Sequence, residues 1–268
     1  MKNRINEKFA RQKAENCGGF IPFIVAGDPN LRITKDLIIE LANQGASIIE
    51  LGVPFSDPVA DGVTIQASAE RALRNPVPVK DIIKIVAEVR AEKCETPIIL
   101  FSYFNPILQF GLENFAEKAT EAGIDGVLIT DLVPEEAEEF RSILAQKDLA
   151  LIMLAAPTSS DERLRKICEK ASGFVYAVSR AGVTGARISL SNDAENLVQR
   201  LRKFTDLPIA VGFGISNAEQ VAETWKYADA AIVGSAIVGE MMKLAPNPNE
   251  IPNDFADKIG KFAKSLLP

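Results

Sequence analysis

The chain contains no histidine. A Ser-His-Asp triad or a Cys-His pair in its usual form is therefore excluded, because both need an imidazole base. Histidine-ligated zinc is excluded for the same reason. Any proton transfer must be carried out by carboxylates, lysine, tyrosine, cysteine or the substrate itself.

Cysteine is scarce, and basic charge is not in excess. The cysteines Cys17, Cys94 and Cys168 are odd in number and lack metal-ligand spacing, which indicates ordinary thiols in a reducing compartment. The net charge of -6 does not support a nucleic-acid partner, which needs a basic face.

Long apolar runs are also missing. No stretch of about 18 apolar residues is present to span a membrane. The first residues are of mixed charge and lack the apolar core of a signal peptide. We therefore expect a cytoplasmic protein that does not bind a membrane. Its composition, 47% hydrophobic and 25% charged, is typical of globular proteins.

Short apolar runs alternate with longer helical patterns along the chain. The runs are almost continuously hydrophobic, which is typical of parallel strands covered on both faces. We predict strands at residues 20–26, 47–51, 97–103, 126–130, 150–154, 174–178, 209–212 and 230–234.

The stretches between these runs have apolar residues at helical spacing. One helix is predicted to stop at Gly45, and a second covers residues 82–89. A third is predicted from Asn105 to Gly123. A fourth is predicted to start at Pro134, because proline and acidic residues favour the first turn. Residues 1–16 and 252–267 are predicted to form extra helices at the two ends of the chain.

Eight strand–helix units in this length predict an α/β fold, a (β/α)8 TIM barrel that forms a single domain over residues 1–268. The alternative architecture is an open, doubly wound sheet. That architecture would favour a G-x-G-x-x-G motif after the first strand, and residues 24–29 do not supply it. In a barrel, the active site lies at the C-terminal ends of the strands.

Residues 48–61 are the most informative part of the chain. Glu50 lies within an apolar strand, where a carboxylate is rarely buried without a partner or a function. The strand then breaks into a loop that carries Asp57 and Asp61. The alternatives are a structural acid paired with tyrosine or arginine for Glu50, and turn-forming roles for the aspartates. Two carboxylates in unlike environments can divide acid and base roles between them.

The predicted strand ends narrow the possible chemistry. None of the predicted strands contains a lysine for a Schiff base. Only Glu50, Asp61 and Asp131 are placed for a cluster of metal-binding acids. Cofactor-free acid–base cleavage or isomerisation is therefore favoured. Tyr103 and Tyr176, at strand ends, fit either the site or a core position with a hydrated hydroxyl.

Glycine-bearing loops follow the last three predicted strands. They comprise residues 180–185, 212–216 and 234–238, and the last leads directly into a helix. In barrels, the loops after strands seven and eight and a helix N-terminus form a recurrent phosphate site. We therefore expect a phosphorylated substrate. Residues 180–185 are a candidate lid, with an ordinary exposed loop as the alternative.

Residues 52–62, GVPFSDPVADG, and the three residues before them resemble the tryptophan synthase α-subunit family. Residues 23–29, 103–106, 180–185 and 211–215 extend the resemblance nearly end to end. It implies a lyase of tryptophan biosynthesis that cleaves indole-3-glycerol phosphate to indole and glyceraldehyde 3-phosphate. The family's two catalytic acids fall on Glu50 and Asp61.

The resemblance also implies the binding residues. The phosphate contacts fall on Gly185, Gly214, Gly234 and Ser235, and the indole-pocket aromatics fall on Phe23, Tyr176 and Phe213. Residues 180–185 match the family's lid, and Thr184 within them is a further candidate substrate contact.

The resemblance further implies a partner, the tryptophan synthase β subunit, in an α2β2 heterotetramer. Pyridoxal phosphate would belong to that subunit, so no cofactor or metal is expected in this chain. One departure is visible after the fourth strand, where the family has Asp-Leu-Pro or Asp-Val-Pro and this chain has Asp131, Leu132, Val133 and Pro134. We expect that departure to affect docking rather than chemistry. The alternatives are a stand-alone lyase that releases free indole, a catalytically silent regulatory barrel, and a phosphate-binding barrel with another substrate.

Overall fold

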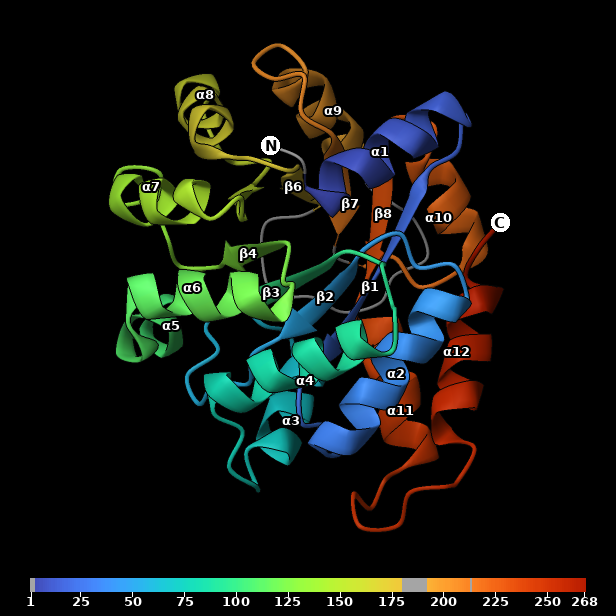
Figure 1. Cartoon of the computed structure of the whole chain (residues 1–268). Coiled ribbons are helices and arrows are strands. Elements are labelled where there is room, and N and C mark those ends of the chain that lie inside the picture. Colours follow the sequence, from blue (N-terminus) through green and yellow to red (C-terminus); the bar gives the residue numbers. More distant parts are fainter. Residues whose placement is uncertain (1–2, 180–191, 213) are drawn as a thin grey trace.

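The computed structural model, which describes residues 3–179, 192–212 and 214–268, contains eight parallel strands in a closed barrel (Figure 1). Neighbours in the barrel are consecutive in the chain, and β1 pairs with β8 to close it. All the predicted strands are present, with small shifts at their ends. They are β1 (Gly19–Val25), β2 (Ile49–Gly52), β3 (Ile98–Ser102), β4 (Gly126–Ile129), β5 (Ala150–Ala155), β6 (Val175–Val178), β7 (Ile209–Gly212) and β8 (Ala230–Val233).

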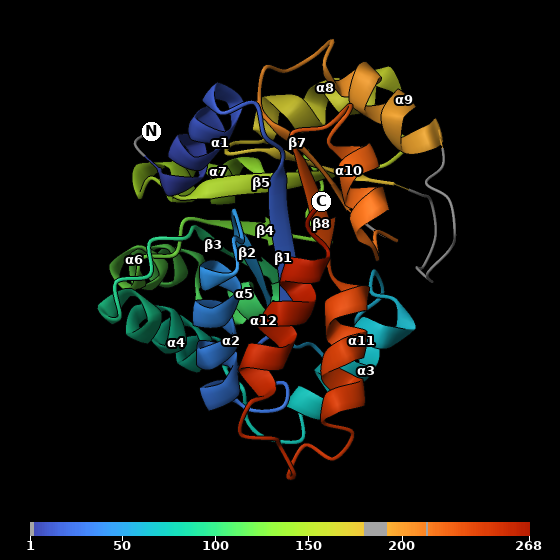
Figure 2. The same ribbon diagram turned by 90° about the vertical axis from the view of Figure 1, so that its right-hand side faces the viewer.

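Helices surround the barrel, and α12 lies between α2 and α11 on its outer side (Figure 2). None of the helices in the described ranges is long and apolar enough to cross a membrane. The predicted terminal helices are present as α1 (Arg4–Ala14) and α12 (Phe255–Ser265). The others are α2 (Leu31–Asn43), α3 (Val63–Ala72), α4 (Val79–Ala91), α5 (Phe104–Phe110), α6 (Leu112–Ala122), α7 (Glu138–Gln146), α8 (Asp161–Lys170), α9 (Asn192–Leu201), α10 (Ala218–Thr224) and α11 (Ser235–Leu244).

Two helix predictions were wrong in detail. The single helix expected from Asn105 to Gly123 is two helices, because Gly111 adopts φ 90° and ψ 127° between α5 and α6. The helix expected to start at Pro134 starts at Glu138. A hydrogen bond from the Glu136 N–H to the Val133 carbonyl, at 3.0 Å, closes a separate turn before it.

The barrel has two apolar cores, one inside the strands and one between strands and helices. Ile48 belongs to the inner core, whereas Ile49 and Leu51 belong to the outer core. Because successive side chains of a strand point to opposite faces, Glu50 points into the barrel. The register places it level with Phe23 of β1.

The N-terminal end of the barrel is closed by α1 and a buried polar cluster. The Asn3 amide donates hydrogen bonds to the carbonyls of Asp125 and Asp148, at 2.7 and 2.8 Å. The Asp125 carboxylate, 3% exposed, forms salt bridges with Arg4 and Arg90. This cluster fixes α1 against the barrel at the end opposite the C-terminal ends of the strands.

Candidate active site

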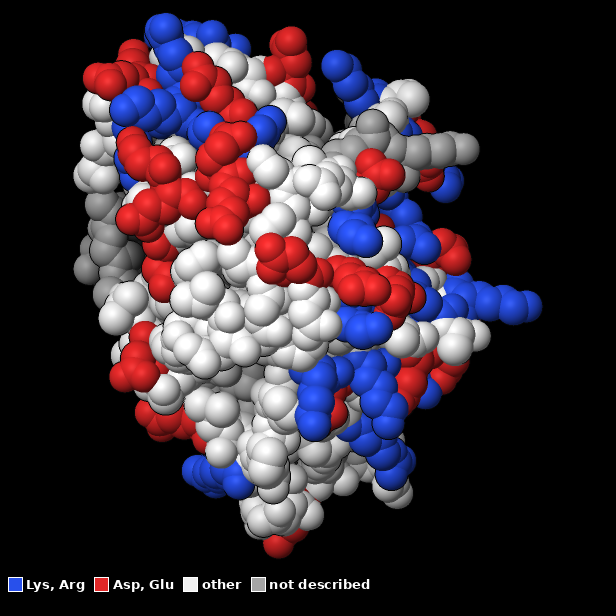
Figure 3. All heavy atoms as spheres, turned by 60° about the vertical axis from the view of Figure 1, so that its left-hand side comes forward, with Lys and Arg blue, Asp and Glu red and all other residues white. Residues whose placement is uncertain are grey.

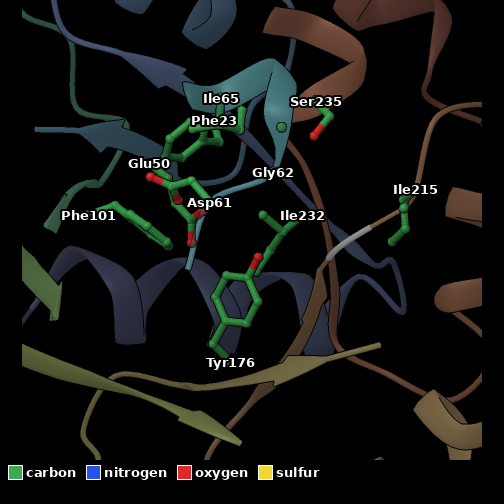
Figure 4. A pocket seen from close by; sticks show the side chains of 12 residues that line it. Phe23, Glu50, Asp61, Gly62, Ile65, Phe101, Tyr176, Ile215, Ile232 and Ser235 are labelled. Carbon is green, nitrogen blue, oxygen red and sulfur yellow. The ribbon is translucent and has the colours of Figure 1, made fainter. Parts of the chain in front are cut away.

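A pocket of about 480 Å³, part of it open to solvent, lies at the C-terminal ends of the strands (Figure 4). The pocket is lined by Phe23, Glu50, Asp61, Gly62, Ile65, Phe101, Tyr176, Gly214, Ile215, Ile232, Gly234 and Ser235. Seven residues predicted from the sequence are therefore together: Phe23, Glu50, Asp61, Tyr176, Gly214, Gly234 and Ser235. Thr184, Gly185, Phe213 and the predicted lid at residues 180–185 lie outside the described residues.

Glu50 is a buried carboxyl group inside the barrel. Its side chain is 1% exposed, and its Oε1 atom has no hydrogen-bond partner among the described residues. Desolvation disfavours the charged form of an acid. Burial accordingly raises the pKa of Glu50 from 4.5 to about 8.

Asp61 precedes Gly62, the N-cap of α3, and is less deeply buried than Glu50. Burial raises the pKa of Asp61 from 3.8 to about 6, while a hydrogen bond from Tyr103 acts to lower it. At neutral pH Asp61 is therefore mostly ionised, whereas Glu50 is mostly protonated. The pocket thus holds one carboxylic acid and one carboxylate, the arrangement needed to give one proton and accept another.

Aromatic side chains form much of the pocket wall. The rings of Phe23 and Phe101 meet edge to face, with centroids 5.2 Å apart and planes at 79°. Tyr176 lies on β6, and its hydroxyl fills space beside Gly212. A Cβ atom at position 212 would lie 2.1 Å from that oxygen, so only glycine fits there. These rings form a slot suited to a flat apolar ring system.

The opposite side of the pocket offers backbone N–H groups. Gly234 is the N-cap of α11, and no side chain caps this helix end. The first N–H groups of a helix lack intrahelical partners and favour anions. Gly214 has φ 84°, and a Cβ atom there would meet nothing within 4 Å. The Ser235 side chain also lines the pocket, so this end suits a phosphate group.

The remaining acids near the site have other contacts. Asp57 accepts a hydrogen bond from the Ser56 hydroxyl at 2.6 Å, in the exposed part of the loop. Asp131 accepts one at 2.7 Å from the N–H of Phe104, the first residue of α5. Among the described residues, no cluster of three His, Cys, Asp or Glu is able to hold a metal ion. Asp131 therefore satisfies a free N–H group in the first turn of α5.

Four apolar lining residues were not predicted: Ile65, Phe101, Ile215 and Ile232. Phe101 and Ile232 belong to the inner core, but β3 and β8 are apolar on both faces, so the sequence does not show which of their residues point inward. Ile65 comes from α3, a helix that was also not predicted. Its apolar pattern is hidden because the polar residues Ser68 and Arg71 are buried on it.

Comparison with known proteins supports one family. The model of the family described as "Tryptophan synthase alpha chain" matches residues 9–266. The tryptophan synthase alpha chain of Prochlorococcus marinus subsp. pastoris is 44% identical over 265 residues, which are 98% of this chain and 92% of that protein. The corresponding protein of Geotalea daltonii is 49% identical over 235 residues, 88% of this chain and 89% of that protein.

Solved structures agree with the sequence relatives. Tryptophan synthase subunit alpha from Legionella pneumophila superposes with a TM-score of 0.88 at 35% identity, over 99% of this chain and 97% of that one. A chain of Mycobacterium tuberculosis tryptophan synthase has a TM-score of 0.88 at 34% identity over the full length of both chains. With the fold, the paired acids and these matches in agreement, the chain belongs to the tryptophan synthase alpha chain family.

Proposed function

We propose that Glu50 and Asp61 carry out the proton transfers of the family's reaction, the α reaction of tryptophan biosynthesis. In that reaction a lyase cleaves the carbon–carbon bond of indole-3-glycerol phosphate, giving indole and glyceraldehyde 3-phosphate. The observation that carries the proposal is the pair of acids in one pocket, with the pKa of Glu50 raised to about 8 and that of Asp61 to about 6.

Glu50 acts first as the general acid. The bond from indole C3 to the glycerol chain breaks readily only when C3 is protonated, because the ring nitrogen can then receive the bonding electrons. Glu50 is protonated at neutral pH and donates its proton to C3. The resulting carboxylate then accepts the proton of the glycerol hydroxyl as the carbonyl group of the aldehyde forms.

Asp61 acts as the anionic partner of the indole ring. Protonation of C3 places positive charge on the indole system, and a carboxylate that accepts a hydrogen bond from the indole N–H stabilises it. Asp61 is ionised under the conditions in which Glu50 is protonated. The aromatic side chains of Phe23, Phe101 and Tyr176 hold the ring, and Gly214, Gly234 and Ser235 bind the phosphate group.

We further propose that the chain is a single domain and acts in the cytoplasm. There it docks on a β subunit that carries pyridoxal phosphate, and the two subunits form an α2β2 assembly. Large apolar side chains are exposed on segments that follow β2, β3 and β4, namely Val59, Leu108 and Val133, at 80%, 49% and 37%. A surface of this kind next to the site suits a partner that receives an apolar product. Figure 3 shows uncharged surface on one face of the molecule, with acidic and basic groups around it.

The alternatives differ in their response to the partner. A stand-alone lyase would be fully active alone, and a silent regulatory barrel would be inactive in all conditions. We expect slow cleavage of indole-3-glycerol phosphate by the isolated chain and an increase of at least tenfold when purified β subunit is titrated in. Indole and glyceraldehyde 3-phosphate would be measured directly. A flat, high activity would identify a stand-alone enzyme, and no activity with saturating β subunit would refute the proposed reaction.

A further inference from the structure

The hydroxyl group of Tyr103 is not explained by packing. Tyr103 follows β3 directly and is 3% exposed. Its ring lies against that of Phe55, with centroids 5.1 Å apart and planes at 31°. A phenylalanine at this position would keep that contact. The buried oxygen therefore needs another reason to be there, since burying a hydroxyl is costly unless it is hydrogen-bonded.

The hydroxyl is bonded to the loop that carries Asp61. It accepts a hydrogen bond from the Ala60 N–H at 2.9 Å, and it donates one to the Asp61 carboxyl group. Ala60 is exposed in an irregular loop, where no neighbouring strand supplies an acceptor. The side chain of Tyr103, directly after β3, therefore holds both the backbone and the carboxyl group at the end of the β2–α3 loop.

The other contacts of Asp61 hold only its backbone. Its N–H donates to the Pro58 carbonyl at 3.1 Å, and its carbonyl accepts from the Gln66 amide at 2.8 Å. The titratable groups that face its carboxyl group are Tyr103 directly after β3, Glu50 of β2 and Tyr176 of β6. Among the described residues, no lysine or arginine forms a salt bridge with Asp61.

We propose that Tyr103 is a positioning residue for Asp61, whose carboxylate it aims into the pocket by holding Ala60 and Asp61 together. The inference rests on the proposed function, because it assigns the orientation of a group that is useful only if Asp61 faces the indole N–H. Without the hydroxyl, the Asp61 backbone keeps its contacts with Pro58 and Gln66, but the Ala60 N–H loses its acceptor and the carboxylate is free to rotate. Holding a reacting group in place lowers the barrier by removing rotational freedom before the reaction.

The same hydrogen bond has an electrostatic effect. Donation to a carboxylate stabilises the charged form, so it opposes the effect of burial on the pKa of Asp61. The pKa of Tyr103 is itself raised to about 12, chiefly by burial, so the hydroxyl remains a donor throughout the working range of pH. Loss of the hydroxyl should therefore raise the pKa of Asp61 and delay its ionisation as pH increases.

The test compares Tyr103→Phe with the wild type in complex with the β subunit, measuring kcat and KM for cleavage of indole-3-glycerol phosphate from pH 5 to pH 9. The matched control is Tyr227→Phe, which removes the hydroxyl of a tyrosine outside the pocket. For Tyr103→Phe we expect kcat to fall by about tenfold or more with KM changed less than about threefold. The acid limb of the profile should move to higher pH, because that limb reports the ionisation of Asp61.

The outcomes separate the two claims. An unchanged kcat and an unchanged acid limb in Tyr103→Phe, with an active wild type, would overturn the positioning role and leave the proposed function standing. Absence of cleavage in the wild type would instead overturn the proposed function. Circular dichroism and thermal unfolding identify a variant that fails to fold. In that case Gln66→Leu offers a second measurement, because it releases only the Asp61 backbone. The inference requires that the acid limb of its pH profile does not move. A shift as large as the one expected for Tyr103→Phe would contradict the inference.

Discussion

The burial of Glu50 favours the proposed chemistry and is unfavourable for the stability of the fold. A carboxyl group that is 1% exposed and has an unbonded oxygen among the described residues gives up hydration without full compensation. The free-energy cost of burial is largest when the carboxyl group is charged, and the raised pKa of Glu50 is a consequence of that cost. The same burial that makes Glu50 an acid at neutral pH therefore lowers the stability of the barrel.

Replacement of this acid should stabilise the protein in a pH-dependent way. Because the folded pKa, about 8, is above the ordinary 4.5, the stability linked to Glu50 is fully present below about pH 4.5 and is lost as pH rises through 8. Glu50→Gln lacks this loss, so its free energy of unfolding should exceed that of the wild type by on the order of a few kcal/mol at pH 9. Urea unfolding at pH 5, 7 and 9 measures the difference, and a gap that does not widen with pH would contradict the account.

A substitution of Gly234 tests the proposed phosphate-binding end of the pocket. A Cβ atom at this position would lie 3.4 Å from the Phe23 ring, so the branches of a valine have little space away from the anion site. Gly234→Val should weaken binding of glycerol phosphate by about tenfold, or about 1.4 kcal/mol. Gly239→Ala, on the same helix, is the control because its Cβ would meet only Thr64, at 3.9 Å. Calorimetric titration that finds equal affinities in a folded Gly234→Val protein would refute the assignment.

Local sequence patterns predict some of the strands and helices that position the site, but not all of them. The strands were predictable because parallel strands buried on both faces leave almost unbroken apolar runs. The helix α3 was not, because its inner face carries Arg71, which forms a salt bridge with the fully buried Asp28 at 2.9 Å. Such a pair forms only when α3 packs against the loop that follows β1, so the periodicity of the sequence does not predict it. The role of Tyr103 was ambiguous for the same reason, since its hydrogen bond with Ala60 links the end of β3 to the loop after β2.

The break between α5 and α6 leads to a prediction about the stability of the protein. Gly111 joins the two helices with φ 90° and ψ 127°, a conformation that a residue with a Cβ adopts only under strain. Gly111→Ala should lower the free energy of unfolding by about 1–3 kcal/mol. The cost is conformational, because the new Cβ would meet only the Asn114 Cβ, at 3.7 Å. Thermal and urea unfolding measure it, and Gly239→Ala, within a regular helix, should instead be neutral or slightly stabilising.

The two ends of the barrel have separate roles in the whole molecule. The N-terminal end is closed by α1, which the Asp125 cluster joins to the barrel. The C-terminal end holds the pocket and, next to it, the exposed apolar side chains Val59, Leu108 and Val133. This division is typical of TIM barrels. It also explains why the fold and the position of Glu50, Asp61 and the glycine loops at one end of the barrel were predictable from order along the chain. The contact between Tyr103 and the Asp61 loop exists only in the closed barrel.

The measurement that most directly tests the account is cleavage of indole-3-glycerol phosphate by Glu50→Gln in the presence of saturating β subunit. The amide keeps the shape of the side chain but cannot deliver a proton to indole C3. We predict a loss of at least a thousandfold in kcat, consistent with the role of an essential general acid. Glycerol phosphate should still bind within about threefold of its wild-type affinity. A folded variant that binds this ligand and retains a tenth of wild-type turnover would contradict the assignment of Glu50 as the acid–base group.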